Sequence, residues 1–268
     1  MQKIAHRTIV SLVRKEYITP NFLRIILHCD DIEHYEETPF GVNNKLFIPP
    51  QGVSDVIMPI FNPETKLWEI EDEARKASVR TYTHRAIDLE KKELTVDFAV
   101  HDGDSVACNW ARDSKPGDKI GLAMKLKHRD VFPEGVEEFL FVTDMTGIPV
   151  VASLIKTLPT TAKATIITEV LSDADILDAH YESPATLNTK WLVNPHPEQG
   201  SELAEHGKKA WETLQGTHFT HVTAEYSVVK SLRDFLRHEN ELSSKEFYAC
   251  AYWQINKRED EEREKRLD

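Results

Sequence analysis

The spacing of hydrophobic residues changes halfway along the chain, and this change constrains the fold more than any other feature. In the first half, apolar and polar residues alternate over short runs, most clearly over residues 22–28 and 94–100. Such alternation is typical of strands with one buried face. Shorter strands are expected over residues 45–48, 80–83 and 120–122. Several short strands separated by turns favour an antiparallel barrel.

In the second half, compact apolar runs are followed by segments with helical spacing. The helical pattern covers residues 148–158, 203–214 and 228–236. Strand–helix alternation predicts a mainly parallel sheet covered on both faces. We therefore expect an antiparallel Greek-key β-barrel over residues 1–133 and a mainly parallel α/β domain over residues 134–268. The expected strands of the α/β domain are residues 139–142, 165–170, 191–193, 219–223 and 247–252.

Charge and cysteine content exclude several functions. A net charge of −12 argues against nucleic-acid binding. The chain contains no run of about 18 apolar residues that could span a membrane, and no signal peptide is evident, so we expect a cytoplasmic protein. We also expect a monomer. The three cysteines cannot supply the thiolates of an ordinary iron–sulfur cluster. Redox chemistry would therefore need an organic cofactor or a metal held by other ligands.

The segment Arg80–Thr83 carries residue types that suit a flavin nucleotide. On a strand, Arg80 and Tyr82 face one side and Thr81 and Thr83 the other. Arg80 could reach a pyrophosphate while Tyr82 presents a flat ring and a phenol. An ordinary exposed strand could have the same composition, so the segment needs support from elsewhere.

Three downstream segments supply that support: residues 97–104, 105–111 and 115–118. With Arg80–Thr83 they give an R-x-Y-T strand, a D-F-A-V-H-D-G-D strand end, an A-C-N-W-A helix and a P-G-D turn. In this order they resemble the siderophore-interacting proteins, FAD-dependent ferric-siderophore reductases of the ferredoxin-NADP reductase-like superfamily. The resemblance implies a barrel domain that binds FAD through Arg80, Thr81, Tyr82, Thr83, Asp97, Phe98, Ala99, His101, Ala107, Cys108 and Trp110.

The short helix departs from the family pattern. Ser105, Val106 and Cys108 stand where the family has Gly, Pro and Ser. A thiol is a weak hydrogen-bond donor, so the phosphate contacts there would depend more on the backbone.

A second site is implied by segments of the C-terminal half. Residues 143–149 resemble the family's G-D-E-T-A-L-P-A segment, which begins a helix with a proline in its first turn. Residues 225–227 resemble another such opening, with Ser227 as the expected N-cap. Residues 251–253 resemble the family's G-Y-W ending. The resemblance implies a nicotinamide-dinucleotide site, and it assigns cofactor contacts to Asp144, Thr146, Gly147, Glu225 and Trp253.

The same resemblance assigns three basic residues to contacts with the substrate. Lys45 matches a v-K-L-f-x-P segment of the family, and Lys257 and Arg258 lie near the end of the chain. These three are the expected contacts to a ferric siderophore. We expect no metal site, since the pair His218 and His221 would diverge on a strand.

The predicted reaction is reduction of siderophore-bound Fe(III) to Fe(II) by FAD, with NADH, NADPH or ferredoxin as the electron donor. No protein side chain is expected to act as acid, base or nucleophile. Glu169 and Asp173 lie near the strand 165–170, and their negative charge disfavours the 2′-phosphate of NADPH, which favours NADH. Two alternatives stay open: a flavin reductase serving ferredoxin or flavodoxin, and a non-catalytic siderophore-binding protein.

Overall fold

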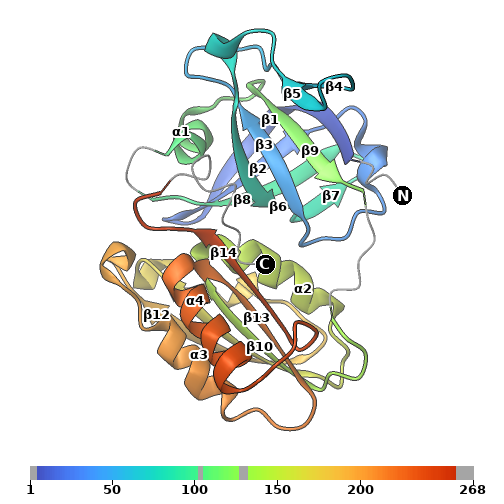
Figure 1. Ribbon diagram of the computed structural model, residues 1–268. Coiled ribbons are helices and arrows are strands. Elements are labelled where there is room, and N and C mark those ends of the chain that lie inside the picture. Colours follow the sequence, from blue (N-terminus) through green and yellow to red (C-terminus); the bar gives the residue numbers. More distant parts are fainter. Residues whose placement is uncertain (1–4, 102–104, 127–131, 258–268) are drawn as a thin grey trace. The chain divides into compact units, whose positions relative to one another are not determined.

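The computed structural model describes residues 5–101, 105–126 and 132–257 (Figure 1). The chain forms two compact units. Of the described residues, the first unit contains those of 5–18 and 22–126, and the second contains residues 19–21 and 132–257.

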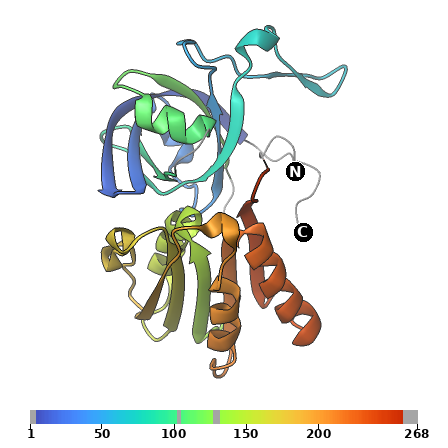
Figure 2. The ribbon, with the colours of Figure 1, turned by 90° about the vertical axis from the view of Figure 1, so that its left-hand side faces the viewer.

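The first unit is an antiparallel barrel-like sheet of seven strands, in the order β6-β3-β9-β1-β2-β8-β7. Two 3-10 turns, η1 (Ile32–Tyr35) and η2 (Glu73–Arg75), and the helix α1 (Val106–Asp113) lie between strands. A separate hairpin of β4 (Ile60–Asn62) and β5 (Leu67–Glu69) extends from the barrel (Figure 2). The sheet consists of β1 (Ala5–Thr19), β2 (Phe22–His28), β3 (Asn43–Ile48), β6 (Ser78–Thr83), β7 (Ala86–Asp88), β8 (Glu93–Ala99) and β9 (Lys119–Lys125).

Alternation of side chains builds the core of this barrel. Leu23, Ile25 and Leu27 on β2 are inaccessible to solvent, and Val96 and Phe98 on the paired strand β8 join them. Each buried apolar side chain contributes about 1.5–3 kcal/mol relative to an exposed one. The predicted antiparallel barrel is therefore confirmed.

The second unit is a five-stranded parallel sheet in the order β12-β11-β10-β13-β14. Chain order therefore reverses between β10 and β13, where the carboxyl ends of the two strands lie side by side. Such a reversal is the usual ligand position in open α/β sheets. The strands are β10 (Glu138–Asp144), β11 (Lys163–Val170), β12 (Thr186–Val193), β13 (His218–Glu225) and β14 (Phe247–Trp253).

Helices cover both faces of this sheet. The helices α3 (Leu203–Trp211) and α4 (Tyr226–Asp234) pack together over Leu140 and Val142 of β10 (Figure 1). The helix α2 (Ile148–Leu154) is buried along its whole length. A π-helical turn, η8 (Phe235–Glu239), extends α4. The 3-10 turns are η3 (Met145–Gly147), η4 (Ile155–Thr157), η5 (Asp173–Asp175), η6 (Asp178–His180) and η7 (Pro197–Gln199).

The predicted parallel α/β domain is confirmed, with all five expected strands and all three expected helical segments. The first strand, β1, was not predicted, because only Val10, Leu12 and Thr19 of its fifteen residues are buried. Arg258 and the charged segment after it lie outside the described residues. Among the helices that the structure describes, none is long and apolar enough to cross a membrane.

Candidate functional site

The strand β6 places Arg80 and Tyr82 on one face, as predicted. Leu46 of β3 lies opposite Arg80, and Asn44 lies opposite Tyr82. Both β3 residues are buried, so this face of β6 continues the inner side of the barrel. The Tyr82 ring packs on Phe98, with 4.2 Å between the ring centroids, and stays half-exposed. The packing holds the ring in place while leaving part of it accessible.

The Arg80 guanidinium lies beside its own strand. It is half-buried, and Nη1 donates a hydrogen bond of 2.9 Å to the carbonyl of Val79.

The Asp97 carboxylate is engaged by two arginines. Asp97 is only 3% exposed and accepts a bidentate pair of hydrogen bonds from Arg24 Nε and Nη2, at 2.7 and 2.8 Å. Arg85 Nε lies 3.5 Å from the second carboxylate oxygen. The hydrogen bond to Asp97 raises the pKa of Arg24. Sequence reasoning missed both arginines, although Arg85 follows the Arg80–Thr83 motif within two residues.

The helix α1 begins beside the end of β8. Ser105 caps it by accepting a hydrogen bond of 3.4 Å from the amide of Cys108, whose thiol lies 3.5 Å from the carbonyl of Ala99. The first turn of a helix carries backbone N–H groups without intrahelical partners, which suits an anion. Ala107 and Cys108 are buried there, and Trp110 packs on the barrel core.

The Cys108 thiol is coupled to His101, another predicted cofactor residue. Burial favours a raised pKa of Cys108, but hydrogen bonds from His101 and Ser105 outweigh it, and the net pKa is lowered. His101 is exposed, and its carbonyl accepts a hydrogen bond from Arg112. The structure therefore brings together the end of β8 and the start of α1.

Lys45 lies on the other face of the barrel wall from Arg80 and Tyr82. It stands opposite Thr81 in the β3–β6 register, and its ammonium donates a hydrogen bond to the Thr81 hydroxyl. Lys257 is exposed, whereas Arg258 lies outside the described residues. The proposed substrate contacts are therefore placed only in part.

In the second unit, Asp144 ends β10 at the reversal of strand order. Its Oδ1 accepts hydrogen bonds from the amide and hydroxyl of Thr146, at 2.8 and 2.5 Å. Its Oδ2 accepts a 2.7 Å hydrogen bond from the indole of Trp253. Burial raises the pKa of Asp144, and these hydrogen bonds oppose the rise. The carboxylate thus caps the turn η3 and positions the Trp253 ring.

Glu225 has the matching position at the end of β13. Its Oε2 accepts hydrogen bonds from the amide and hydroxyl of Ser227, and its Oε1 accepts one of 3.3 Å from the amide of Ile255. Glu225 is therefore the N-cap of α4, and the prediction that Ser227 would be the cap is wrong.

Gly147 is required by the space around it. A Cβ atom there would lie 2.1 Å from Thr143 Oγ1 and 2.5 Å from Thr223 Oγ1. The two threonines are hydrogen-bonded to each other across β10 and β13, and both are inaccessible to solvent. The absence of a side chain lets η3 approach both strand ends closely.

The sequence favours NADH through two acidic residues near β11, Glu169 and Asp173. Glu169 is 7% exposed and accepts a 2.5 Å hydrogen bond from the Ser201 hydroxyl. Burial raises its pKa. The carboxylate is thus occupied within the unit, so its charge is a weak argument against a 2′-phosphate. The predicted divergence of His218 and His221 is consistent with their positions on β13.

An antiparallel barrel followed along the chain by an open parallel sheet is the fold of solved ferredoxin-NADP+ reductases. The structure of a ferredoxin-NADP+ reductase from Plasmodium falciparum aligns with this chain at a TM-score of 0.59 and 13% identity. The alignment covers 92% of this chain and 97% of that one. The chain belongs to the siderophore-interacting protein family. Residues 11–124 match the family's siderophore-interacting FAD-binding domain, and residues 136–256 match the siderophore-interacting protein model.

Relatives cover nearly the whole chain. The ferric vibriobactin reductase ViuB of Vibrio cholerae is 28% identical over 96% of this chain and 93% of its own length. The NADPH-dependent ferric-chelate reductase of Escherichia coli is 28% identical over 91% of both. The siderophore-interacting protein SipS of Aeromonas hydrophila has the same fold, with a TM-score of 0.77 and 23% identity over 96% of this chain and 94% of that one.

Proposed function

We propose that this protein is a flavin-dependent reductase that converts siderophore-bound Fe(III) to Fe(II) and so releases iron in the cytoplasm. The observation that carries the proposal is the match of residues 11–124 to a siderophore-interacting FAD-binding domain. That range contains the strand β6, the end of β8 and the start of α1. The names of the two curated relatives support ferric-chelate reduction as the activity.

The barrel residues fit FAD by their chemistry. Tyr82 offers a ring that is packed on one side and partly exposed, which suits contact with an isoalloxazine. Arg80 and the first turn of α1 offer N–H donors to a diphosphate. Asp97 is better suited to orienting Arg24 and Arg85 than to contacting the cofactor with its own carboxylate, because its oxygens are already engaged.

Bound FAD would supply the conversion of electron pairs from a nicotinamide into the single electrons that iron accepts. The protein residues would position the cofactor and the substrate, and none of them would need to transfer a proton. In the second unit, we place the nicotinamide dinucleotide at the carboxyl ends of β10 and β13, where Asp144 and Glu225 fix the backbone turns. The name of the Escherichia coli relative supports NADPH as the donor.

The substrate is a ferric siderophore, and Lys45, Lys257 and Arg258 are its proposed contacts. Because the chain carries a net charge of −12, an anionic chelate would be repelled at long range. Local basic groups would have to offset that field. Reduction weakens the complex because Fe(II) is a poorer match than Fe(III) for hard oxygen donors.

The test is an anaerobic assay on purified full-length protein. It should show flavin absorbance, oxidise NADPH or NADH, and deliver Fe(II) from a ferric hydroxamate or catecholate to a ferrous chelator. Arg80→Ala should weaken FAD binding about tenfold or more, since hydrogen bonds to charged groups contribute about 1.5–3 kcal/mol. Arg75→Ala in η2 is the matched control and should bind FAD normally. A protein that neither contains nor takes up flavin would refute the proposal.

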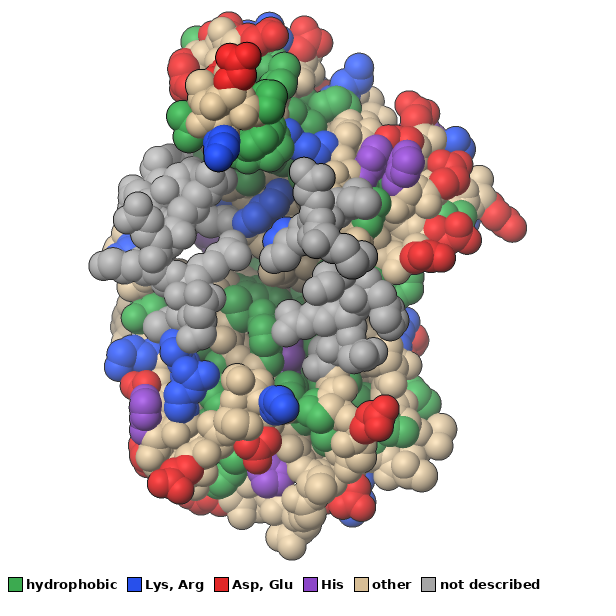
Figure 3. Space-filling view, turned by 45° about the vertical axis from the view of Figure 1, so that its right-hand side comes forward, with side chains coloured by type: hydrophobic (Ala, Val, Ile, Leu, Met, Phe, Trp, Pro, Cys, Tyr) green, Lys and Arg blue, Asp and Glu red, His purple; other side chains and the backbone are tan. Residues whose placement is uncertain are grey.

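A second candidate function is electron transfer to a carrier protein such as ferredoxin or flavodoxin. The β4–β5 hairpin favours it, because Ile60, Phe61, Leu67 and Trp68 are 46–63% exposed. Hydrophobic side chains are visible at the top of the space-filling view, mixed with acidic ones (Figure 3). Exposed apolar patches of this kind mark interaction sites. Steady-state assays with a ferric siderophore and with a carrier protein as competing acceptors separate the two functions.

A further inference from the structure

A cluster of metal-ligating side chains lies in the first unit, among residues that the flavin site does not use. His6 near the start of β1, Asp31 after β2 and His34 in η1 each offer one ligand atom, and the three atoms lie within 4.8 Å of one another. Asp31 and His34 lie 25 and 28 positions after His6 in the sequence, so only the fold brings the three residues together. The sequence pattern did not single them out.

His6 Nε2 lies 2.5 Å from Asp31 Oδ2. Two atoms bound at about 2.0–2.1 Å to one tetrahedral zinc ion lie about 3.3 Å apart, so His6 Nε2 and Asp31 Oδ2 would have to separate slightly to share an ion. The rings of His6 and His34 are stacked, with 4.1 Å between their centroids and 30° between their planes. The side chains of His6 and Asp31 are 22% and 37% exposed, and His34 is exposed. An ion could therefore enter from solvent without a change of fold.

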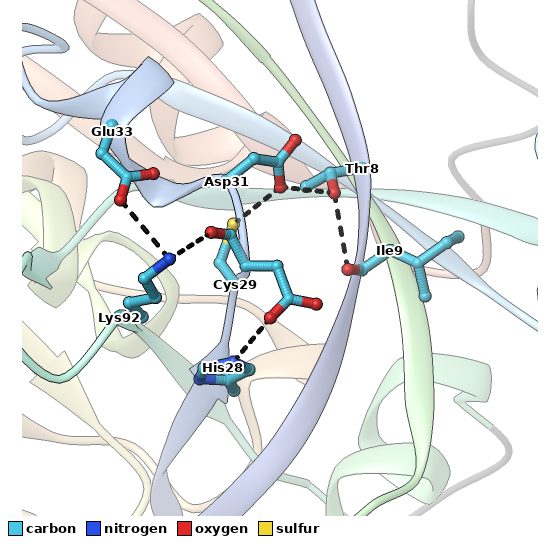
Figure 4. A network of polar contacts seen from close by, with 8 residues as sticks. Thr8, Ile9, His28, Cys29, Asp31, Glu33 and Lys92 are labelled. Atoms are coloured by element: carbon cyan, nitrogen blue, oxygen red, sulfur yellow. Dashed lines mark hydrogen bonds and ion pairs between the residues drawn. The ribbon is translucent and has the colours of Figure 1, made fainter.

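Neighbouring groups hold the carboxylate in place. Thr8 Oγ1 donates a hydrogen bond of 2.8 Å to Asp31 Oδ1, and the Cys29 thiol lies 3.6 Å from the same oxygen (Figure 4). The other carboxylate oxygen, Asp31 Oδ2, faces His6. The buried ring of Tyr35 contacts the edge of the His6 ring, at a centroid distance of 5.3 Å. Such outer contacts are what orients ligands in metal sites.

We propose that His6, Asp31 and His34 form a binding site for a divalent first-row transition-metal ion. Imidazole nitrogen suits Zn²⁺, Ni²⁺, Cu²⁺ and Fe²⁺, whereas Ca²⁺ and Mg²⁺ require oxygen ligands. Three protein ligands leave coordination positions for water, which is typical of exchangeable rather than closed structural sites. Binding would link the start of β1 to η1.

A simple ion pair between a histidine and an aspartate is the competing explanation, and the same unit contains one for comparison. His28 Nε2 lies 3.1 Å from Asp30 Oδ1, and both side chains are more exposed than those of the His6 pair. Among the described residues, no second imidazole joins His28 and Asp30 in a three-ligand cluster. The second imidazole, His34, is therefore the feature that distinguishes a metal site from an ion pair.

The experiment is calorimetric titration of chelator-treated, full-length protein, with its flavin retained, against ZnCl₂. We expect one saturable site, with no comparable binding of CaCl₂ or MgCl₂. His34→Ala and Asp31→Asn should each weaken zinc binding at least about tenfold, because even outer-sphere changes cost about 10–100-fold. His28→Ala is the matched control and should bind as the unmodified protein does.

Two results would overturn the proposal: the absence of saturable zinc binding, or equal affinity in the unmodified protein, His34→Ala and Asp31→Asn. His34 is exposed, so its substitution should preserve folding, and the far-ultraviolet circular dichroism of each variant checks this. The titration involves no electron transfer, so its outcome is independent of the proposed reductase activity.

Discussion

Substitution of Gly147 by alanine tests whether close packing of η3 against two strand ends organises the second unit. The new methyl carbon would lie 2.1 and 2.5 Å from the hydroxyl oxygens of Thr143 and Thr223, and 2.8 Å from the Thr223 carbonyl. Overpacking costs about 1–3 kcal/mol. Separating the buried threonine pair costs about another 1–3 kcal/mol. We therefore expect Gly147→Ala to lower the free energy of unfolding of this unit by about 2–6 kcal/mol.

Gly207 in α3 provides a matched control. A Cβ atom there would meet only side-chain methyl groups, at 3.0 Å from Leu232 and 3.1 Å from Val142. Alanine is also favoured over glycine within a helix by about 0.5–1 kcal/mol. Gly207→Ala should therefore change the free energy of unfolding by less than about 1 kcal/mol.

Urea unfolding followed by far-ultraviolet circular dichroism measures both variants. A functional readout comes from reducing the flavin in two ways. NADPH should reduce it much more slowly in Gly147→Ala, whereas dithionite, which needs no dinucleotide site, should reduce it as in the unmodified protein. If Gly147→Ala unfolds at the same urea concentration as Gly207→Ala, the steric argument is wrong.

Three further substitutions test buried polar groups. Burial lowers the pKa of His221 to about 3, so between about pH 6.5 and pH 3 this residue takes up a proton only in the unfolded chain, and its share of the stability lost between pH 8 and pH 5 should be about 2 kcal/mol. Burial also lowers the pKa of His84 to about 4, which adds a similar share, so His221→Phe should remove about half of the pH dependence in urea titrations. Asp97→Asn should cost about 3 kcal/mol by leaving the Arg24 guanidinium without its carboxylate; an unchanged urea midpoint would contradict this. Trp253→Phe removes the indole donor to Asp144 and should cost about 1–3 kcal/mol, measured as a lower melting temperature.

Strand and helix positions could be read from the sequence because each has a local cause. The alternation of Leu23, Ile25 and Leu27 predicts a half-buried strand whatever the rest of the chain does, and β2 has the expected bounds. The strand β1 had no such signal, because most of its side chains are partly exposed and its pairing with β9 is a long-range contact. Local periodicity thus predicts an element only where one face is fully buried.

The candidate site divides along the same line. The motif around Arg80 and Tyr82 could be recognised because its residues are close in sequence, and their shared face follows from the period of a strand. The residues' contacts to FAD stay a prediction. The engagement of Asp97 by Arg24 could not have been foreseen, because those two residues come from different strands and meet only through the β2–β8 register.

By itself, the sequence determined the class of each half, the family, and the short segments suited to a dinucleotide, because periodicity and motif spacing are local properties. Only the tertiary structure decided which polar atoms meet. It joined the Asp144 carboxylate to the Trp253 indole and the Glu225 carboxylate to the Ile255 amide, which lie 109 and 30 positions away in sequence. It also assembled His6, Asp31 and His34 from separate elements, because side chains distant in sequence become neighbours only when the chain folds.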